Sequence, residues 1–154
     1  MRESVSAILV CKDEIFTVKR QNHLNVFPGY EAFPGGKVDK SDVDVLAALS
    51  RELDEELGFD LEEAKLSGNL IKVQYLGLAI TPSFNPYRFK NHYYKIFLNT
   101  KPEFNVDEGE AVRWGWSSAC NVLADFDKGN LLTVPVFNNV VKNLQENLDS
   151  EVEV

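Results

Sequence analysis

The sequence predicts an α/β domain in which a mixed β-sheet packs between helices. Segments with the alternation or apolar character of β-strands recur along the chain, and two longer segments have the periodicity of amphipathic helices. Strands and helices alternate irregularly, a pattern that favours a mixed sheet covered by helices. The chain has 154 residues, 44% of them hydrophobic, so residues 1–154 are expected to form one domain with its own core.

Six segments are expected to be strands because they combine apolar alternation or aromatic residues with flanking turn signals. A polar turn at Lys12 and Asp13 joins the first two, and residues 82–89, with two prolines, separate the fourth from the fifth as a loop. The polar segment from Asp60 to Gly68 is expected to be a connection. The six strands are Ser4 to Cys11, Glu14 to Lys19, Tyr30 to Phe33, Asn69 to Thr81, Asn91 to Asn99 and Glu110 to Ser117.

The main helix is expected from about Asp42 to Leu57. Ser41 followed by Asp44 resembles a capping box at its start, and Gly58 indicates its end. Its apolar side chains recur at spacings of three and four, so they form one stripe that would be buried. The stripe consists of Leu46, Leu49, Leu53 and Leu57.

Two further helices are expected in the C-terminal part of the chain. Ser117 to Leu123 has the look of a short helix, and Pro135 to Leu148 is amphipathic with a proline in its first turn. The acidic tail from Asp149 to Val154 is expected to fray.

Composition disfavours some classes of partner. With 16 basic and 24 acidic residues, the formal net charge is −8, which disfavours binding to a nucleic-acid backbone and repels any polyanion unless metal ions screen the site. Cys11 and Cys120 are too few for a disulfide framework, and the apolar run from Val5 to Val10 is too short for a signal peptide. No segment is long enough to span a membrane. The two cysteines fit a reduced environment, and we expect a cytoplasmic protein.

Three carboxylates lie beside the leucine stripe of the main helix. At about 100° per residue, Glu52, Glu55 and Glu56 fall within one arc, where like charges repel one another. An acidic solvated helix face is the usual explanation of such a run. Here a Pro-Gly-Gly turn, an Arg-Glu pair beginning at Arg51 and a Glu-Glu-x-Gly ending coincide, which favours a site for a hard divalent cation such as Mg²⁺ or Mn²⁺.

At these residues the sequence resembles the Nudix hydrolases, whose signature is Gly-x5-Glu-x7-Arg-Glu-U-x-Glu-Glu-x-Gly-U, with U an apolar residue. The second half of the signature matches position for position from Arg51 to Phe59. In the first half Asp42 takes the place of the glutamate, with eight residues before Arg51, so either Asp42 or Asp44 substitutes for it. This insertion resembles the coenzyme A pyrophosphatase branch, which writes the segment as FPGG-x-x-D-x-x-D.

The resemblance implies the Nudix α/β/α sandwich and a metal-dependent active site. It implies that the metal ions are held by Glu52, Glu55, Glu56 and the carbonyl group of Gly35, and that Arg51 orients the carboxylates. Catalytic roles are thereby implied for Arg51, Glu52 and Glu55. A further glutamate, as metal ligand or general base, is implied at either Glu108 or Glu110, depending on which tryptophan is aligned. The general base is either this glutamate or one of the helix glutamates, because members of the family differ in this respect.

Substrate contacts are expected from three parts of the chain. Arg20 follows the second strand close in sequence to the glycine turn, where phosphate contact and a solvated loop are equally good interpretations. Gly36 of that turn is expected to contact the substrate. The segment TPSFNPYRF resembles one in the coenzyme A branch and implies that Arg88 and Phe89 lie near the substrate; a core aromatic and a surface arginine are the alternative.

The expected activity is hydrolysis of a phosphoanhydride by metal-activated water. The substrate would be a small nucleotide-derived molecule, first coenzyme A or an acyl-coenzyme A, then a nucleoside diphosphate sugar or ADP-ribose, and third a nucleoside triphosphate. A non-catalytic Nudix-fold nucleotide-binding module is a different class, but it predicts erosion of the Arg-Glu and Glu-Glu pairs, and both are intact. Homodimers are common in that family, although no segment of this sequence marks an interface.

Overall fold

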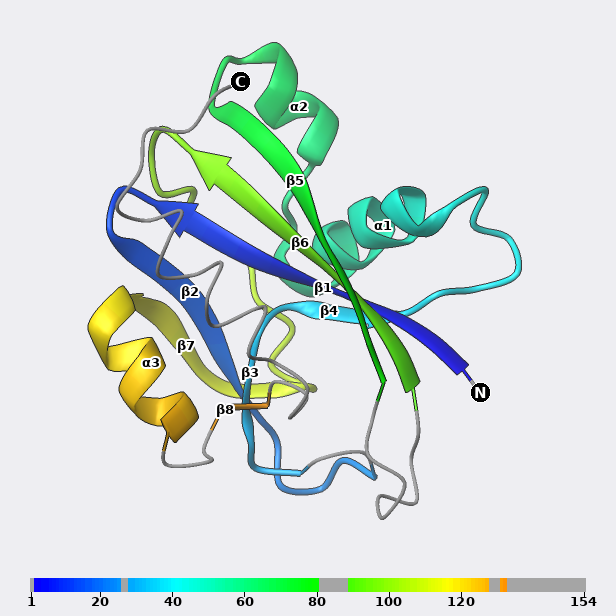
Figure 1. Ribbon diagram of the computed structural model, residues 1–154, viewed down its shortest axis with the longest axis vertical. Helices are drawn as coiled ribbons and strands as arrows, with labels where there is room; N and C mark the ends of the chain where they lie inside the picture. The colour runs from blue at the N-terminus through cyan, green and yellow to red at the C-terminus, as the bar shows by residue number, and fades with distance from the viewer. Residues whose placement is uncertain (1, 26–27, 81–88, 128–130, 133–154) are drawn as a thin grey trace.

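The computed structural model describes residues 2–25, 28–80, 89–127 and 131–132, which form one sheet with helices on both faces (Figure 1). The main path of the sheet runs β5-β6-β1-β2-β3-β8, with β4 paired to β1 and β7 paired to β2. The strands are β1 (Arg2–Cys11), β2 (Glu14–Arg20), β3 (Glu31–Ala32), β4 (Gly35–Lys37), β5 (Leu70–Ile80), β6 (Phe89–Leu98), β7 (Ala111–Ser118) and β8 (Leu131–Leu132).

Strand β1 organises this sheet. It pairs in parallel with β6 along its whole length, from Arg2 opposite Phe89 to Cys11 opposite Leu98. On its other side, β2 pairs antiparallel with its C-terminal end, whereas β4 pairs antiparallel with residues 4–6. On this side, the neighbour of β1 is therefore β2 at its C-terminal end and β4 in its N-terminal half. The cavity described below lies beside this N-terminal half.

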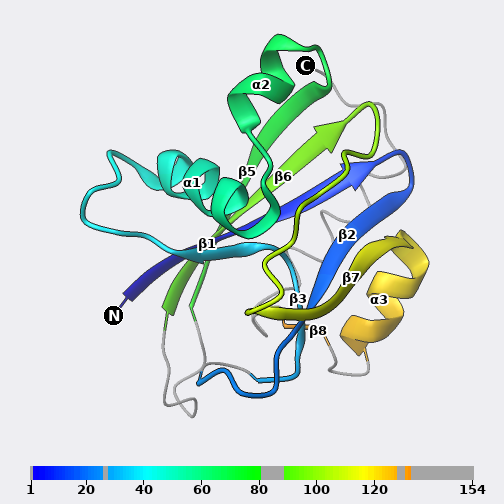
Figure 2. The same ribbon diagram turned by 180° about the vertical axis from the view of Figure 1, so that it is seen from behind.

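Helices cover the two faces of the sheet, as the α/β prediction requires. Helices α1 (Val45–Leu57) and α2 (Leu61–Leu66) lie on the face seen in Figure 2, and α3 (Ala119–Asp127) lies on the opposite face. Each face has its own hydrophobic cluster. One contains Leu49, Leu53 and Leu57 of α1, and the other contains Ile8 and Val10 of β1 with Val122 of α3.

The main helix is shorter at its start than predicted. It begins at Val45, and the side chain of Asp44 caps it by accepting a hydrogen bond from the Ala47 amide (2.7 Å), so Ser41 is not the cap. At the other end Gly58 adopts φ +63°, the left-handed conformation that was expected of a helix stop. Leu46 belongs to the predicted stripe but is 40% exposed, because the first helical turn extends beyond the sheet.

The connection predicted from Asp60 to Gly68 contains helix α2, so this prediction was wrong. The side chain of Asp60 accepts a hydrogen bond from the Glu63 amide at 3.1 Å and caps the helix, while Leu61 and Ala64 are buried. The sequence did not predict this helix, because a helix of six residues is too short to show a periodic apolar pattern.

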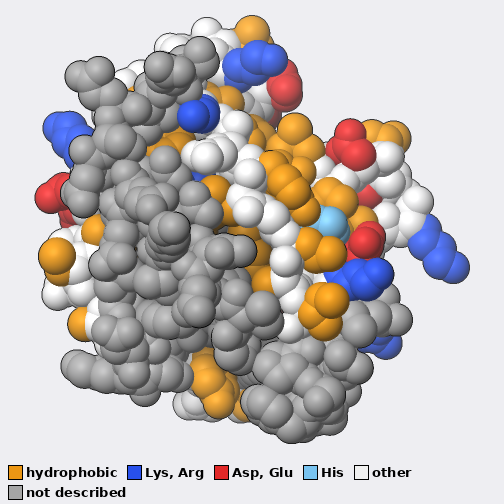
Figure 3. All heavy atoms as spheres, in the orientation of Figure 1, with side chains coloured by type: hydrophobic (Ala, Val, Ile, Leu, Met, Phe, Trp, Pro, Cys, Tyr) orange, Lys and Arg blue, Asp and Glu red, His pale blue; other side chains and the backbone are white. Residues whose placement is uncertain are grey.

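The six predicted strands all occur, with ends that differ by one or two residues. The predicted C-terminal helix from Pro135 to Leu148 and the acidic tail lie outside the described residues. Strand β5 lies at an end of the strand order, and its side chains Tyr75, Leu78 and Ile80 are exposed hydrophobic groups; hydrophobic side chains gather along this edge in Figure 3. Among the described helices, none combines the length and apolar character needed to cross a membrane.

Candidate active site

Strand β4 brings the glycine turn into contact with helix α1. A Cβ atom on Gly35 would lie 2.0 Å from the carbonyl oxygen of Val5, so only glycine lets β4 approach β1 this closely. A Cβ atom on Gly36 would lie 2.3 Å from the carboxyl carbon of Glu52. The two glycines therefore seat the turn against the sheet on one side and against a helix carboxylate on the other.

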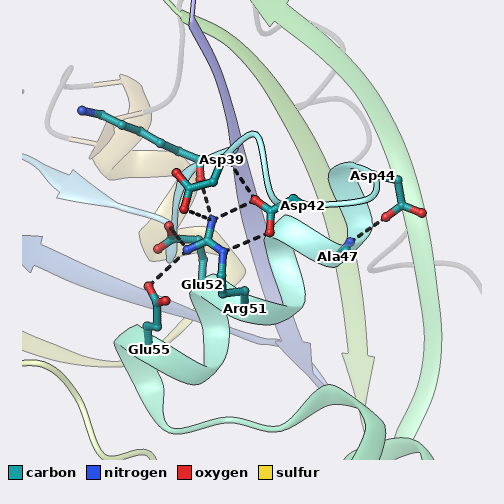
Figure 4. Close-up of polar contacts among 8 residues, drawn as sticks. Asp39, Asp42, Asp44, Ala47, Arg51, Glu52 and Glu55 are labelled. Carbon is teal, nitrogen blue, oxygen red and sulfur yellow. Dashed lines mark hydrogen bonds and ion pairs between the residues drawn. The ribbon is translucent and has the colours of Figure 1, made fainter.

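Arg51 is the centre of a charged network at the rim of the site (Figure 4). Its guanidinium donates to both carboxylate oxygens of Asp42 at 3.1 and 3.0 Å, to Glu52 at 3.0 Å and to Glu55 at 3.2 Å. It also donates to the carbonyl oxygen of Lys37 at 2.9 Å. This planar fork fixes the loop before α1 and two carboxylates of the helix in one arrangement.

The structure separates the roles of the two aspartates that could replace the signature glutamate. Asp42 forms the two-pronged pair with Arg51, and the hydrogen bond from Arg51 lowers the pKa of Asp42. Asp44 instead caps α1 and takes no part in that pair. Of these two aspartates, Asp42 is thus the one that pairs with Arg51, although its side chain is shorter than that of a glutamate and one more residue separates it from Arg51 than in the signature.

Glu56 is the most buried of the three helix carboxylates, with 7% of the residue exposed. Its side chain accepts a hydrogen bond from the Gly35 amide at 3.0 Å. Burial, reinforced by the nearby charges of Glu110 and Glu52, raises the pKa of Glu56 to about 8. Burial also raises the pKa of Glu52, whereas Glu55 has a side chain that is 60% exposed.

Arg20 and Glu110 line the same cavity as Glu52 and lie close enough for their charges to act on Glu56. Desolvation lowers the pKa of Arg20, and the charges of Glu110 and Glu56 partly offset that effect. Gln21, the residue after Arg20, holds the loop that carries Glu110. Its backbone amide donates a hydrogen bond to the Glu110 carbonyl oxygen at 2.8 Å. The side chain of Gln21 donates to the carbonyl oxygens of Glu108 at 3.0 Å and Ala111 at 3.3 Å.

These groups line one cavity of about 530 Å³ between the glycine turn, α1 and the ends of β1 and β6. Of the two candidate glutamates before the tryptophan strand, Glu110 lines this cavity and Glu108 is not among its described lining residues. Glu56 lies beside the cavity, where its carboxylate accepts the hydrogen bond from the Gly35 amide. Arg88 lies outside the described residues. The predicted site residues that line the cavity are Arg20, Gly35, Gly36, Arg51, Glu52, Glu55, Phe89 and Glu110.

Sequence reasoning missed several polar residues in or beside the site. Asn91 lines the cavity at 8% exposure and is hydrogen-bonded to Ser4 and Ser6. Gln21 anchors the Glu110 loop. No local pattern marks these residues, because their partners lie more than 80 positions away in the sequence.

The oxygen-only donor set suits a hard divalent cation such as Mg²⁺ or Mn²⁺. Among the described residues no three acidic, histidine or cysteine side chains stand together as a ready-made metal site. Instead, Arg51 donates hydrogen bonds to Glu52 and Glu55, and the Gly35 amide donates one to Glu56. Burial nevertheless raises the pKa of both Glu52 and Glu56, because Arg51 and the Gly35 amide offset the desolvation of their ionised forms only in part, and a bound cation would offset more of it.

Comparison with known proteins shows which family the chain resembles. The family model described as "NUDIX domain" matches residues 1–134. A protein named "Uncharacterized Nudix hydrolase NudL" from Enterobacter sp. (strain 638) is 32% identical over 100 residues, which is 64% of this chain and 52% of that protein. The chain thus spans about half the length of the curated relatives it matches.

Solved structures share the fold. The NUDIX hydrolase from Alicyclobacillus acidocaldarius superposes with a TM-score of 0.78 at 20% identity, covering 97% of this chain and 96% of that one. The NUDIX domain of Shewanella oneidensis NrtR, crystallised with ADP ribose, superposes with a TM-score of 0.69 at 16% identity, covering 96% and 88%. With a family model matched along most of its length, this chain belongs to the NUDIX domain family.

Proposed function

We propose that this protein hydrolyses a phosphoanhydride bond in a nucleoside diphosphate linked to a second moiety. The observation that supports this most is the cavity that Glu52, Glu110 and Arg20 line together, with the buried Glu56 beside it and within reach of the charges of Arg20 and Glu110. Carboxylates can hold hard cations, and an arginine can bind phosphate oxygens, so the two halves of a pyrophosphate site are present together.

Each group of the site receives a role under this proposal. Glu52, Glu55, Glu56 and the Gly35 carbonyl would hold the metal ions, which when bound supply a water of lowered pKa and neutralise charge on the phosphate. Arg51 would orient Glu52 and Glu55 while Asp42 holds its guanidinium. Glu110, which lines the cavity, is the better candidate than Glu108 for the general base.

Coenzyme A or an acyl-coenzyme A is our first candidate substrate. The FPGG-x-x-D-x-x-D pattern and the TPSFNPYRF segment support it, and Phe89 of that segment lines the cavity. The second candidate is ADP-ribose or a nucleoside diphosphate sugar. It is favoured by structural similarity to the NrtR domain crystallised with ADP ribose and to a bifunctional NMN adenylyltransferase/ADP ribose pyrophosphatase from Francisella tularensis, at a TM-score of 0.66.

A product assay by mass spectrometry separates these candidates. The protein would be incubated with Mg²⁺ and, in parallel, with coenzyme A, acetyl-coenzyme A, ADP-ribose, UDP-glucose and the nucleoside triphosphates. Formation of 4′-phosphopantetheine and 3′,5′-ADP from coenzyme A would support the first candidate. Cleavage of ADP-ribose or UDP-glucose alone would transfer the assignment to the second, and no product from any compound would overturn the proposed activity.

The two aspartates before α1 give a matched pair of variants. Asp42→Asn should lower kcat about tenfold or more, because the neutral amide no longer holds the Arg51 guanidinium that orients the carboxylates. Asp44→Asn should retain both activity and most of the stability, while Asp44→Ala should cost about 1 kcal/mol by removing the helix cap. Steady-state kinetics and thermal melting test this, and equal activity losses at the two positions would contradict it.

A further inference from the structure

Gln21 connects the end of β2 to the turn that precedes β7. The two strands pair antiparallel and lie side by side in Figure 2, and Arg20 opposite Ala111 is the last pair of their register. Beyond this pair the Gln21 backbone amide donates a hydrogen bond to the carbonyl oxygen of Glu110 at 2.8 Å. The turn that carries Glu110 therefore lies just outside the regular sheet, next to Gln21.

The side chain of Gln21 adds two hydrogen bonds to the same turn. Its Nε2 atom donates to the carbonyl oxygen of Glu108 at 3.0 Å and to that of Ala111 at 3.3 Å. A primary amide has two N–H donors, so both of them bind the backbone of this turn. Gln21 thus contacts the chain before and after Glu110 as well as the carbonyl group of Glu110 itself.

On its other side the turn is attached to helix α1. The Asp107 amide donates to the carbonyl oxygen of Glu56 in this helix at 2.8 Å. The amides of Glu110 and Ala111 both donate to the Asp107 carbonyl oxygen, each at 3.1 Å, and close the turn. The turn is therefore held between Gln21 at the end of β2 and the helix that carries the acidic group.

The position of the Glu110 carboxylate depends on this backbone. Glu110 is an exposed residue, and within the described part of the chain no hydrogen bond holds its carboxylate. The turn alone sets the point from which this side chain reaches the cavity that it lines. A general base must lie within hydrogen-bonding reach of the proton that it removes. Order in the turn is therefore a requirement for the role proposed for Glu110.

We propose that Gln21 is a positioning residue for Glu110, whose side-chain amide clamps the turn and keeps the Glu110 carboxylate at the cavity. The proposal rests on the proposed function in one respect, that Glu110 acts as the general base of the hydrolysis. Gln21 is outside the described lining of the cavity, so it acts through Glu110 and not by contact with the substrate.

The substitution Gln21→Met tests the clamp, because methionine has a similar length and volume but no N–H donor. The two carbonyl groups that lose their donor are in exposed or half-buried surroundings, where water can replace it, so the melting temperature should change little. We expect kcat to fall about tenfold, a part of the hundredfold that a displacement of about 1 Å can cost. KM should stay the same, because the groups proposed to bind the substrate are unchanged.

A double-mutant cycle with Glu110→Gln distinguishes positioning from a general structural role. Glu110→Gln alone should lower kcat about a hundredfold or more, as the loss of a general base does. Adding Gln21→Met to this variant should lower kcat no further, because the group that Gln21 positions is already absent. A further tenfold loss in the double variant would show a structural role and overturn the proposal. Wild-type kcat in either single variant would overturn it as well.

Amide hydrogen exchange, followed by NMR, tests the clamp without any hydrolysis. In Gln21→Met the amides of Glu110 and Ala111 should exchange about fivefold faster or more, since one hydrogen bond contributes about this factor to a local opening equilibrium. Asn99→Leu is the matched control. It removes a side-chain amide that donates to the Gly68 carbonyl oxygen at 2.8 Å in another loop, and it should leave kcat and these two exchange rates unchanged.

The outcomes distinguish this proposal from the proposed function. If the wild type cleaves no compound of the substrate panel, the proposed function fails, and the exchange rates still decide whether Gln21 clamps the turn. Faster exchange of the Glu110 and Ala111 amides in Gln21→Met would then support the clamp, and unchanged exchange would overturn it. Hydrolysis by the wild type together with unchanged kcat in Gln21→Met would support the proposed function and reject the clamp.

Discussion

Replacing Glu56 by glutamine is expected to lower kcat about a thousandfold while leaving the protein folded. Glutamine has the same shape and can still accept the hydrogen bond from the Gly35 amide. It cannot carry the negative charge that holds a divalent cation, so the acidic site loses its most buried ligand candidate. Steady-state kinetics over a range of Mg²⁺ concentrations tests this, and turnover close to the wild-type rate would exclude Glu56 from the reaction.

The same substitution should change how stability depends on pH in the metal-free protein. Burial raises the pKa of Glu56 to about 8 from an ordinary value of 4.5. Between these two pH values, Glu56 therefore keeps its proton in the folded state and has lost it in the unfolded state. Wild-type stability should therefore fall as pH rises from about 4.5 to about 8, and the loss should be complete above that range. The glutamine variant has no proton to release, so it should become more stable than the wild type across this window.

Thermal melts in EDTA at several pH values measure this difference, and the same melts with Mg²⁺ provide the control. Bound cation favours ionised Glu56, so Mg²⁺ should stabilise the wild type most at alkaline pH and the glutamine variant much less. Parallel melting curves for the two proteins at every pH would show that the carboxyl group is already ionised in the folded state.

Much of the fold could be predicted from local pattern, and the failures have physical causes. Leu49, Leu53 and Leu57 recur at helical spacing and are all fully buried, so the prediction of α1 rested on a real periodicity. Strand β4 was not foreseen, since Gly35 and Gly36 have low strand propensity and pair only because β1 accepts them at close range. Such pairing is decided by the tertiary fold.

The site was predictable where its residues follow one another in sequence. The α1 carboxylates and Arg51 stand within two turns of helix, and their mutual contacts appear as expected. The choice between Asp42 and Asp44 depended instead on where the helix begins, a boundary that sequence fixes only to within a few residues. Asn91 could not be identified as a residue of the cavity. Its hydrogen bond with Ser4, 87 residues away in the sequence, forms only because β6 pairs in parallel with β1.

The substitution Gly36→Ala in the glycine turn is expected to cause the second large loss of activity. The new methyl group would fall 2.3 Å from the carboxyl carbon of Glu52, and this flexible side chain can move where backbone could not. The fold should therefore survive while the Glu52 carboxylate is displaced from Arg51, and a displacement of about 1 Å at a reacting centre can cost about a hundredfold in rate. We expect kcat to fall by at least about this factor with little change in melting temperature.

Gly35→Ala and Gly115→Ala bracket this result. At Gly35 the methyl group would lie 2.0 Å from a backbone oxygen of the central strand, so we expect a loss of roughly 3 kcal/mol or more in the free energy of unfolding. At Gly115, in β7, an added Cβ atom would have no heavy atom of the described residues within 4 Å, so alanine should be neutral in both assays. Melting temperature and kcat should be measured on all three variants. We expect Gly35→Ala to lower the melting temperature, Gly36→Ala to lower kcat at nearly unchanged melting temperature, and Gly115→Ala to change neither. If Gly36→Ala lost stability as severely as Gly35→Ala, the turn would be shown to support the fold at both glycines, and the assignment of Gly36 to the placement of Glu52 would fail.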